Sequence, residues 1–120
     1  LVPTLCDYAR VTPMPFLNGI SQFPILADPA AAVRDSCLIE YRNGYGDNDC
    51  SSKVLVTQGQ KYVRYQNGEE ELTDLAADPV ESANVVEDGA YDKHRLSLRN
   101  RLLDEVLRTE PRGPDQISHA

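Results

Sequence analysis

Residues 53–75, KVLVTQGQKYVRYQNGEEELTDL, contain three short runs in which apolar and polar side chains alternate. Alternation with a period of two is typical of strands that bury one face. Tight turns at Gly59 and at Asn67–Gly68 separate the runs, which cover residues 53–58, 61–66 and 70–75. Together with SCLIEYR at 36–42, which is rich in β-branched and aromatic residues, they predict an antiparallel meander of three to four strands.

A long amphipathic helix is predicted from about Tyr91 to Arg108. Its broad apolar side is expected to hold Tyr91, Leu96, Leu98, Leu102, Leu103, Val106 and Leu107. Arg95 and Arg99 fall inside that side, where a pure core helix would not place them. They could extend to solvent, pair with acids or meet another protein surface. We predict that at least one of them pairs with a carboxylate on the sheet.

The run DPVESAN, residues 78–84, carries the signals of a helix start. Asp78 can cap, Pro79 suits the first helical position and Glu81 can reach back to the cap. A short helix is therefore predicted from Pro79, ending at the EDG run of 87–89. A further short helix is predicted over residues 3–10. The expected fold class is α+β: a small antiparallel sheet packed against a C-terminal helix and preceded by a short helix.

Composition excludes some functions. The chain has 120 residues and a formal net charge of −7, which argues against nucleic acid and against anionic membrane surfaces as partners. No apolar stretch has the length of a membrane span. Cys6, Cys37 and Cys50 lack metal-ligand spacing. A Cys37–Cys50 bridge across a hairpin is conceivable, but partly buried reduced thiols are the preferred interpretation, and they favour the cytoplasm.

The residues alone indicate no self-contained active site. Asp47, Asp49 and Ser51 alternate as in a calcium loop, but Ser52 and Gln58 replace the Gly and Glu that such a loop needs, so a polar turn is predicted. Nothing marks either histidine as catalytic, and there is no phosphate-binding glycine loop. No catalytic and no metal-binding residue is predicted. One hypothesis is therefore an independent acidic binding or scaffold module.

The order of several motifs resembles the sulfatases of the alkaline-phosphatase-like superfamily. LVPTLCDYARV at 1–11 is similar to their D-[IL]-x-P-T-[IL]-L-x-x-A-G, and LNGISQFPIL at 17–26 to D-G-x-S-L-x-P-x-L. Residues 53–86 resemble R-x-[IL]-x-T-x-x-Y-K-Y-[IV] followed by E-L-Y-D-L-x-x-D-P-x-E-x-x-N-L. Arg10 and Thr73 depart from the family's Gly and Tyr. The resemblance implies that Asn84 fastens its turn to the sheet.

The resemblance also implies what is missing. Sulfatases use a formylglycine made from C-x-P-S-R and a calcium ion, and no cysteine here is followed by x-Pro-x-Arg. We therefore expect no cofactor in this chain and no activity of the chain alone. The expected divisions are residues 1–32 from the end of the catalytic domain, 33–110 as the sulfatase C-terminal subdomain and 111–120 as a flexible tail. The Leu1 start suggests a fragment.

The resemblance further suggests a substrate contact. The loop YRNGYGDNDC, residues 41–50, follows a strand whose end commonly lies toward the sulfatase cleft. Arg42, Asn43 and Tyr45 are the candidate substrate-binding residues, because their side chains can hydrogen-bond a polar sulfate ester. The expected partners are the missing N-terminal catalytic domain and a small-molecule or glycan sulfate ester. An ordinary hairpin loop without a ligand is the alternative.

Overall fold

The computed structural model describes residues 1–15, 17–43 and 50–110, and the predicted Tyr45 contact lies outside them. The chain forms two compact units. One consists of Leu1–Asp35 and the residues after Arg108, and the other of Ser36–Arg108.

The first unit contains two short helices, α1 (Val2–Ala9) and α2 (Phe23–Ala27). The Thr4 hydroxyl accepts a hydrogen bond from the Gln22 backbone N–H at 3.0 Å, and the rings of Tyr8 and Phe23 meet edge to face. The predicted helix at 3–10 is confirmed within a residue at each end. It ends at Arg10 with φ of 56°, in the left-handed region, which explains why a glycine suits this position.

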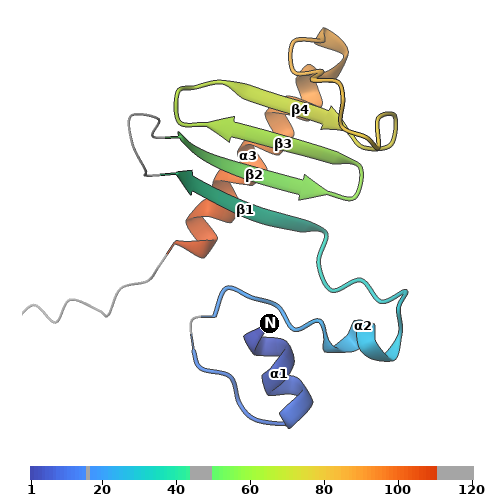
Figure 1. The fold of residues 1–120 in the computed structure, drawn as a ribbon, viewed down its shortest axis with the longest axis vertical. Coiled ribbons are helices and arrows are strands. Elements are labelled where there is room, and N and C mark those ends of the chain that lie inside the picture. Colours follow the sequence, from blue (N-terminus) through green and yellow to red (C-terminus); the bar gives the residue numbers. More distant parts are fainter. Residues whose placement is uncertain (16, 44–49, 111–120) are drawn as a thin grey trace, which may run out of the picture. The chain divides into compact units, whose positions relative to one another are not determined.

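The second unit is built on a four-stranded antiparallel sheet with the strand order β1-β2-β3-β4 (Figure 1). The strands are β1 (Ser36–Asn43), β2 (Cys50–Thr57), β3 (Gln60–Tyr65) and β4 (Glu70–Asp74), so the predicted meander is confirmed. One row of facing residues crosses all four strands: Leu38, Leu55, Tyr62 and Leu72. Since the last three are fully buried, this row forms the sheet side of the core.

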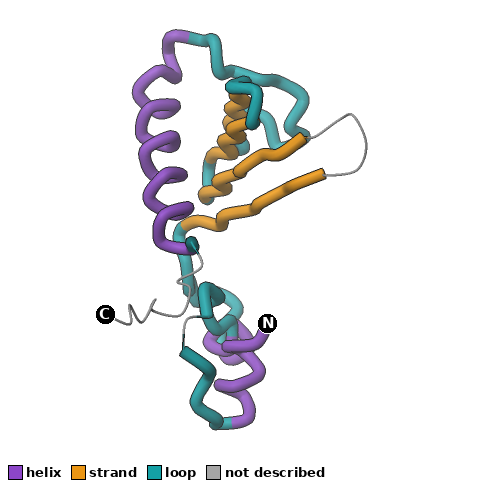
Figure 2. Tube along the Cα trace, turned by 90° about the vertical axis from the view of Figure 1, so that its left-hand side faces the viewer, coloured by secondary structure: helices purple, strands orange, loops and turns teal. Residues whose placement is uncertain are grey.

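Helix α3 (Asp92–Thr109) follows a 3₁₀ turn, η1 (Gly89–Tyr91), and lies along one face of the sheet (Figure 2). Leu98 and Leu102 are buried against the row, and Tyr91 and Val106 are partly buried there. The predicted apolar side was too broad, because Leu96, Leu103 and Leu107 are each about 60% exposed. These leucines lie on another side of the helix. The α+β class with a C-terminal helix is confirmed.

The predicted helix from Pro79 is wrong. Asp78 does accept from the Ala83 N–H, at 2.8 Å, but Glu81 has φ of 58° and its carboxylate pairs with Lys61 instead of returning to the cap. The Val85 N–H then donates to the Leu72 carbonyl at 2.8 Å. This bond draws the chain alongside β4, so a helix cannot continue.

The cysteines form no disulfide. Cys37 faces Val56 and Cys50 faces Asn43, at opposite ends of the β1–β2 pair. The register therefore excludes the Cys37–Cys50 bridge and agrees with reduced thiols. Among the helices of the described ranges, none combines the length and apolar character needed to cross a membrane.

Candidate functional site

A polar hollow of about 490 Å³ lies where the β1–β2 pair approaches its connecting loop. The strands β1 and β2 provide most of its wall, and the residue after β3 provides the rest. The lining residues are Glu40, Tyr41, Arg42, Ser51, Lys53 and Gln66.

The strand register accounts for this set of residues. Arg42 faces Ser51 directly, and Glu40 faces Lys53, so each β1 residue has a β2 neighbour within side-chain reach. Lys53 forms an ion pair with Glu40. Arg42 has no carboxylate partner in the described ranges, which leaves one uncompensated positive charge among the lining residues. On a chain with net charge −7, this is a local preference for an anionic or hydrogen-bond-accepting ligand.

Of the residues predicted from the sequence, Arg42 lines the hollow and Asn43 follows it at the end of β1. Sequence reasoning missed Ser51, Lys53 and Gln66. An antiparallel neighbour for 36–42 was predicted at 53–58, which includes Lys53, but Ser51 was expected in the polar turn and lies in β2 instead, because β2 begins at Cys50. Gln66 could be placed in the hollow only once β3 was paired with β2. Its backbone N–H donates to the Ser51 carbonyl at 2.9 Å.

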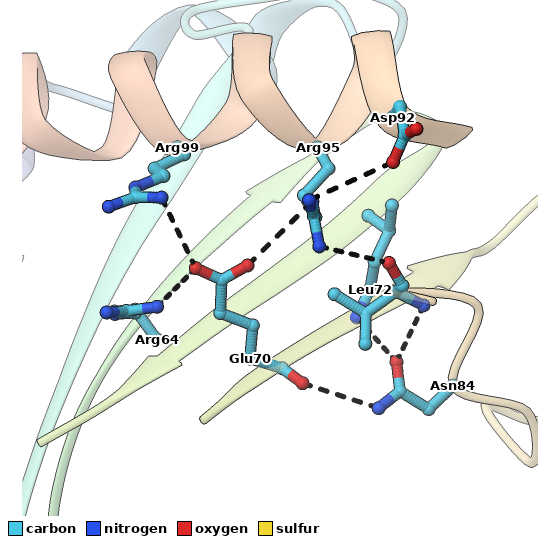
Figure 3. A network of polar contacts seen from close by, with 8 residues as sticks. Arg64, Glu70, Leu72, Asn84, Asp92, Arg95 and Arg99 are labelled. Atoms are coloured by element: carbon cyan, nitrogen blue, oxygen red, sulfur yellow. Dashed lines mark hydrogen bonds and ion pairs between the residues drawn. The ribbon is translucent and has the colours of Figure 1, made fainter. Parts of the chain in front are cut away.

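A second hollow, of about 540 Å³, lies between α3 and the end of the sheet around Glu70. The Glu70 side chain is 12% exposed and meets three arginines (Figure 3). It pairs with Arg64, lies 3.8 Å from the Arg99 Nη1 and 4.0 Å from the Arg95 Nε. The prediction that an arginine of this helix pairs with a sheet carboxylate is confirmed.

This arginine cluster around Glu70 fastens α3 to the sheet. Arg95 also donates to the Val86 carbonyl at 3.4 Å and lies 3.8 Å from Asp92. Beneath the cluster, the Tyr62 hydroxyl is buried with no hydrogen-bond partner in the described ranges. Burial, and then the nearby Glu70 carboxylate, raise the pKa of Tyr62 to about 12. The phenol therefore stays neutral, and the cluster is interpreted as structural.

Asn84 closes the outer edge of β4 beside this cluster (Figure 3). Its Oδ1 accepts from the backbone N–H groups of Leu72 at 2.9 Å and Val86 at 3.1 Å, and its Nδ2 donates to the Glu70 carbonyl at 3.4 Å. The expectation that Asn84 fastens its turn to the sheet is confirmed.

Neither hollow has the composition of a metal centre. Within residues 1–15, 17–43 and 50–110, no group of three or more His, Cys, Asp or Glu side chains comes together to hold a metal ion. With the Arg42 guanidinium, the Gln66 amide and the hydroxyl groups of Tyr41 and Ser51, the hollow of the β1–β2 pair can bind and orient a polar group.

The sequence pattern of the N-sulphoglucosamine sulphohydrolase C-terminal family matches residues 1–108 of this chain. The chain belongs to this sulfatase family. It is 28% identical over 107 residues to an arylsulfatase of Clostridium perfringens, covering 88% of this chain and 21% of that protein. It is 30% identical over 112 residues to a Delta 4,5-hexuronate-2-O-sulfatase of Bacteroides thetaiotaomicron, covering 92% of this chain and 23% of that protein.

The solved structures agree with this sulfatase family. One neighbour, solved in complex with its substrate D-glucosamine-2-N,6-O-disulfate, superposes with a TM-score of 0.80 at 25% identity and covers 96% of this chain and 24% of that one. The chain thus spans about a fifth to a quarter of the length of the sulfatases it matches. The resemblance to the sulfatase C-terminal subdomain is confirmed.

Proposed function

We propose that this chain is the C-terminal part of a sulfuric-ester hydrolase and that its β1–β2 hollow borders the substrate cleft. The observation that carries the proposal is the family match over residues 1–108, combined with the Arg42 guanidinium in the wall of the hollow, which meets no carboxylate among the described residues. In this function the chain supports a catalytic domain supplied by another part of the enzyme.

The substrate class we propose is a sulfated saccharide. The names of one relative and of one neighbour's ligand refer to a hexuronate 2-O-sulfate and to a glucosamine disulfate. Arg42 can hold a sulfate or carboxylate group through two parallel N–H donors. Asn43, Tyr45 and Ser51 can hydrogen-bond sugar hydroxyls. Such contacts orient the substrate without taking part in bond cleavage.

The chemistry itself is proposed to lie outside this chain. Formylglycine and calcium would supply the nucleophile and charge neutralisation in the whole enzyme. The residues here fit neither group: no cysteine begins a C-x-P-S-R sequence, and the described ranges contain no metal-ligating cluster.

The test uses the full-length enzyme. Arg42→Ala and Tyr45→Ala are each expected to lower kcat/KM for a sulfated saccharide by about 1–3 kcal/mol of transition-state stabilisation, because each removes a hydrogen bond to a charged or polar group. A small aryl sulfate lacks the saccharide groups that these residues are proposed to contact, so its kcat/KM should be affected much less. Arg108→Ala, which removes an arginine paired with Glu105 on α3, is the control. Equal effects on both substrates, or no effect on either, would show that the hollow does not contact the substrate and that residues 41–50 form an ordinary hairpin connection.

A further inference from the structure

The two edges of the sheet differ. The outer edge of β4 is closed by Asn84 and by the bond from the Val85 N–H to the Leu72 carbonyl. Within the second unit, Ser36–Arg108, no other described strand pairs with the outer edge of β1, and residues 39–42 are all exposed. An open strand edge is a template for pairing with another strand.

The hydrogen bonds identify which groups β1 presents. The Ser51 carbonyl accepts from Gln66, so Ser51 directs its backbone groups toward β3, and its neighbour Ser52 directs them toward β1. Since Ser52 faces Tyr41, the backbone groups of Tyr41 point into the sheet. By alternation, those of Glu40 and Arg42 point outward, away from β2.

The side chains of this edge are self-complementary. Glu40 and Arg42 share one face of the strand, and Ile39 and Tyr41, about half exposed, share the other. We infer that β1 pairs antiparallel with β1 of a second copy of this chain, about a two-fold axis through Tyr41. Glu40 of each copy then lies opposite Arg42 of the other, and each such pair exchanges two backbone hydrogen bonds.

Charge selects this register among its neighbours. Shifting the pairing so that the axis passes through residue 40 places Glu40 opposite Glu40, and an axis through residue 42 places Arg42 opposite Arg42. Like charges directly opposite destabilise a strand pair. The Lys53 that pairs with Glu40 within each copy reduces this repulsion at residue 40, whereas the two Arg42 guanidiniums have no such compensation among the described residues. On the other face, the chosen register brings the two Tyr41 rings together and reduces their exposure to water.

The inference goes beyond the proposed function and can be tested separately from it. The pairing engages the same guanidinium as the proposed substrate contact, so a sulfated saccharide and a second copy would compete for Arg42. Because the test below contains no substrate, its outcome does not depend on sulfatase activity.

The experiment is sedimentation equilibrium of the 120-residue chain over a wide concentration range, with compensating charge variants. The chain should show a monomer–dimer equilibrium. Glu40→Arg should raise the dimer Kd by about tenfold or more, because it opposes two pairs of positive charges. The double variant Glu40→Arg/Arg42→Glu should return it to within about threefold of the original, because opposite charges face each other again.

The matched control is Asp104→Arg. It makes the same charge change on the exposed side of α3, and it should leave the Kd unchanged. Circular dichroism checks that each variant is folded, and hydrogen exchange should show that the Glu40 and Arg42 amides gain protection as concentration rises. A chain that stays monomeric, a dimer that ignores Glu40→Arg or is not restored by the double variant, or a dimer without protection of these amides would overturn the inference.

Discussion

Asn84 shows how one side chain can replace a missing strand. The amide sits on the exposed edge of β4 and satisfies the Leu72 and Val86 N–H groups and the Glu70 carbonyl together. A further strand at this position would have supplied the same kinds of bond. The position of Asn84, which follows the end of β4, therefore has a physical cause.

Replacing this amide should destabilise the second unit. Asn84→Ala is expected to lower the free energy of unfolding by about 1–3 kcal/mol, because the partly buried Leu72 N–H loses its acceptor. Urea denaturation followed by circular dichroism measures the change. Asn100→Ala, on the exposed side of α3, is the control and should be neutral or slightly stabilising, since Ala is the better helix former. Equal losses in the two variants would contradict the role of Asn84.

Two arginines of α3, Arg95 and Arg99, share the Glu70 carboxylate as their acceptor on the sheet. Arg95 and Arg99 could each be satisfied by solvent, since their side chains are 37% and 58% exposed. The Glu70 side chain, in contrast, is only 12% exposed. A carboxylate that is largely removed from water is costly unless positive charges lie beside it, so Glu70 depends on the arginines. The cluster therefore determines where α3 packs on the sheet, in addition to stabilising the second unit.

At the scale of elements, α3 is bound to the sheet by a narrow stripe. Only Leu98 and Leu102 among its described leucines are buried, with Arg95 and Arg99 beside them. Tyr91 adds a polar anchor at the start of the helix, donating its hydroxyl to Asp74 at the end of β4 at 3.0 Å. This bond raises the pKa of Tyr91, and Asp74 has a lowered pKa caused first by the Ala77 N–H and then by Tyr91.

The narrow stripe predicts a sharp contrast between adjacent leucines. Leu102→Ala is expected to cost about 2–5 kcal/mol of unfolding free energy, because it leaves a cavity against the Leu55–Tyr62–Leu72 row. Leu103→Ala, one residue away and exposed, should change it by no more than about 0.5 kcal/mol. The two midpoints in urea, measured side by side, decide the matter. A similar cost at both positions would mean that the outer leucines are covered in solution.

At the scale of the whole molecule, the chain contains a folded sheet–helix unit, no cysteine begins a C-x-P-S-R sequence, and residues 1–15, 17–43 and 50–110 hold no metal-ligating cluster. The two relatives named above are about four times as long, because 88% and 92% of this chain cover 21% and 23% of them. In the proposed hydrolase, this part of the chain would support the catalytic domain and contact the substrate.

The chain alone is accordingly expected to turn over no aryl sulfate. The reason is the lack of a C-x-P-S-R sequence and of a metal-ligating cluster in the described ranges. The purified chain is incubated with a chromogenic aryl sulfate, with and without calcium, beside a full-length sulfatase as positive control. Chelator-sensitive hydrolysis by the chain would contradict the proposal that the catalytic groups lie outside it.

The sequence by itself determined the local periods, the turns and the family. Alternation over 53–75, the turns at Gly59 and Asn67–Gly68 and the β-rich run at 36–42 are properties of neighbouring residues, so a meander of three to four strands and a final helix were predictable. The motif order was sufficient for the sulfatase assignment. These features depend on interactions within a few residues, which a pattern can report directly.

Only the tertiary structure decided the contacts between distant residues. The capping signals at Asp78 predicted a helix, but the Leu72 carbonyl recruited Val85 and held the segment beside β4. The helix wheel could not tell that Leu102 would be buried and Leu103 exposed. Lys53 and Gln66 joined Arg42 only once the strands were paired in register. In each case the deciding group lies on another element: an unpaired backbone group, a buried face or a charge. A local sequence pattern carries no information about that distant group.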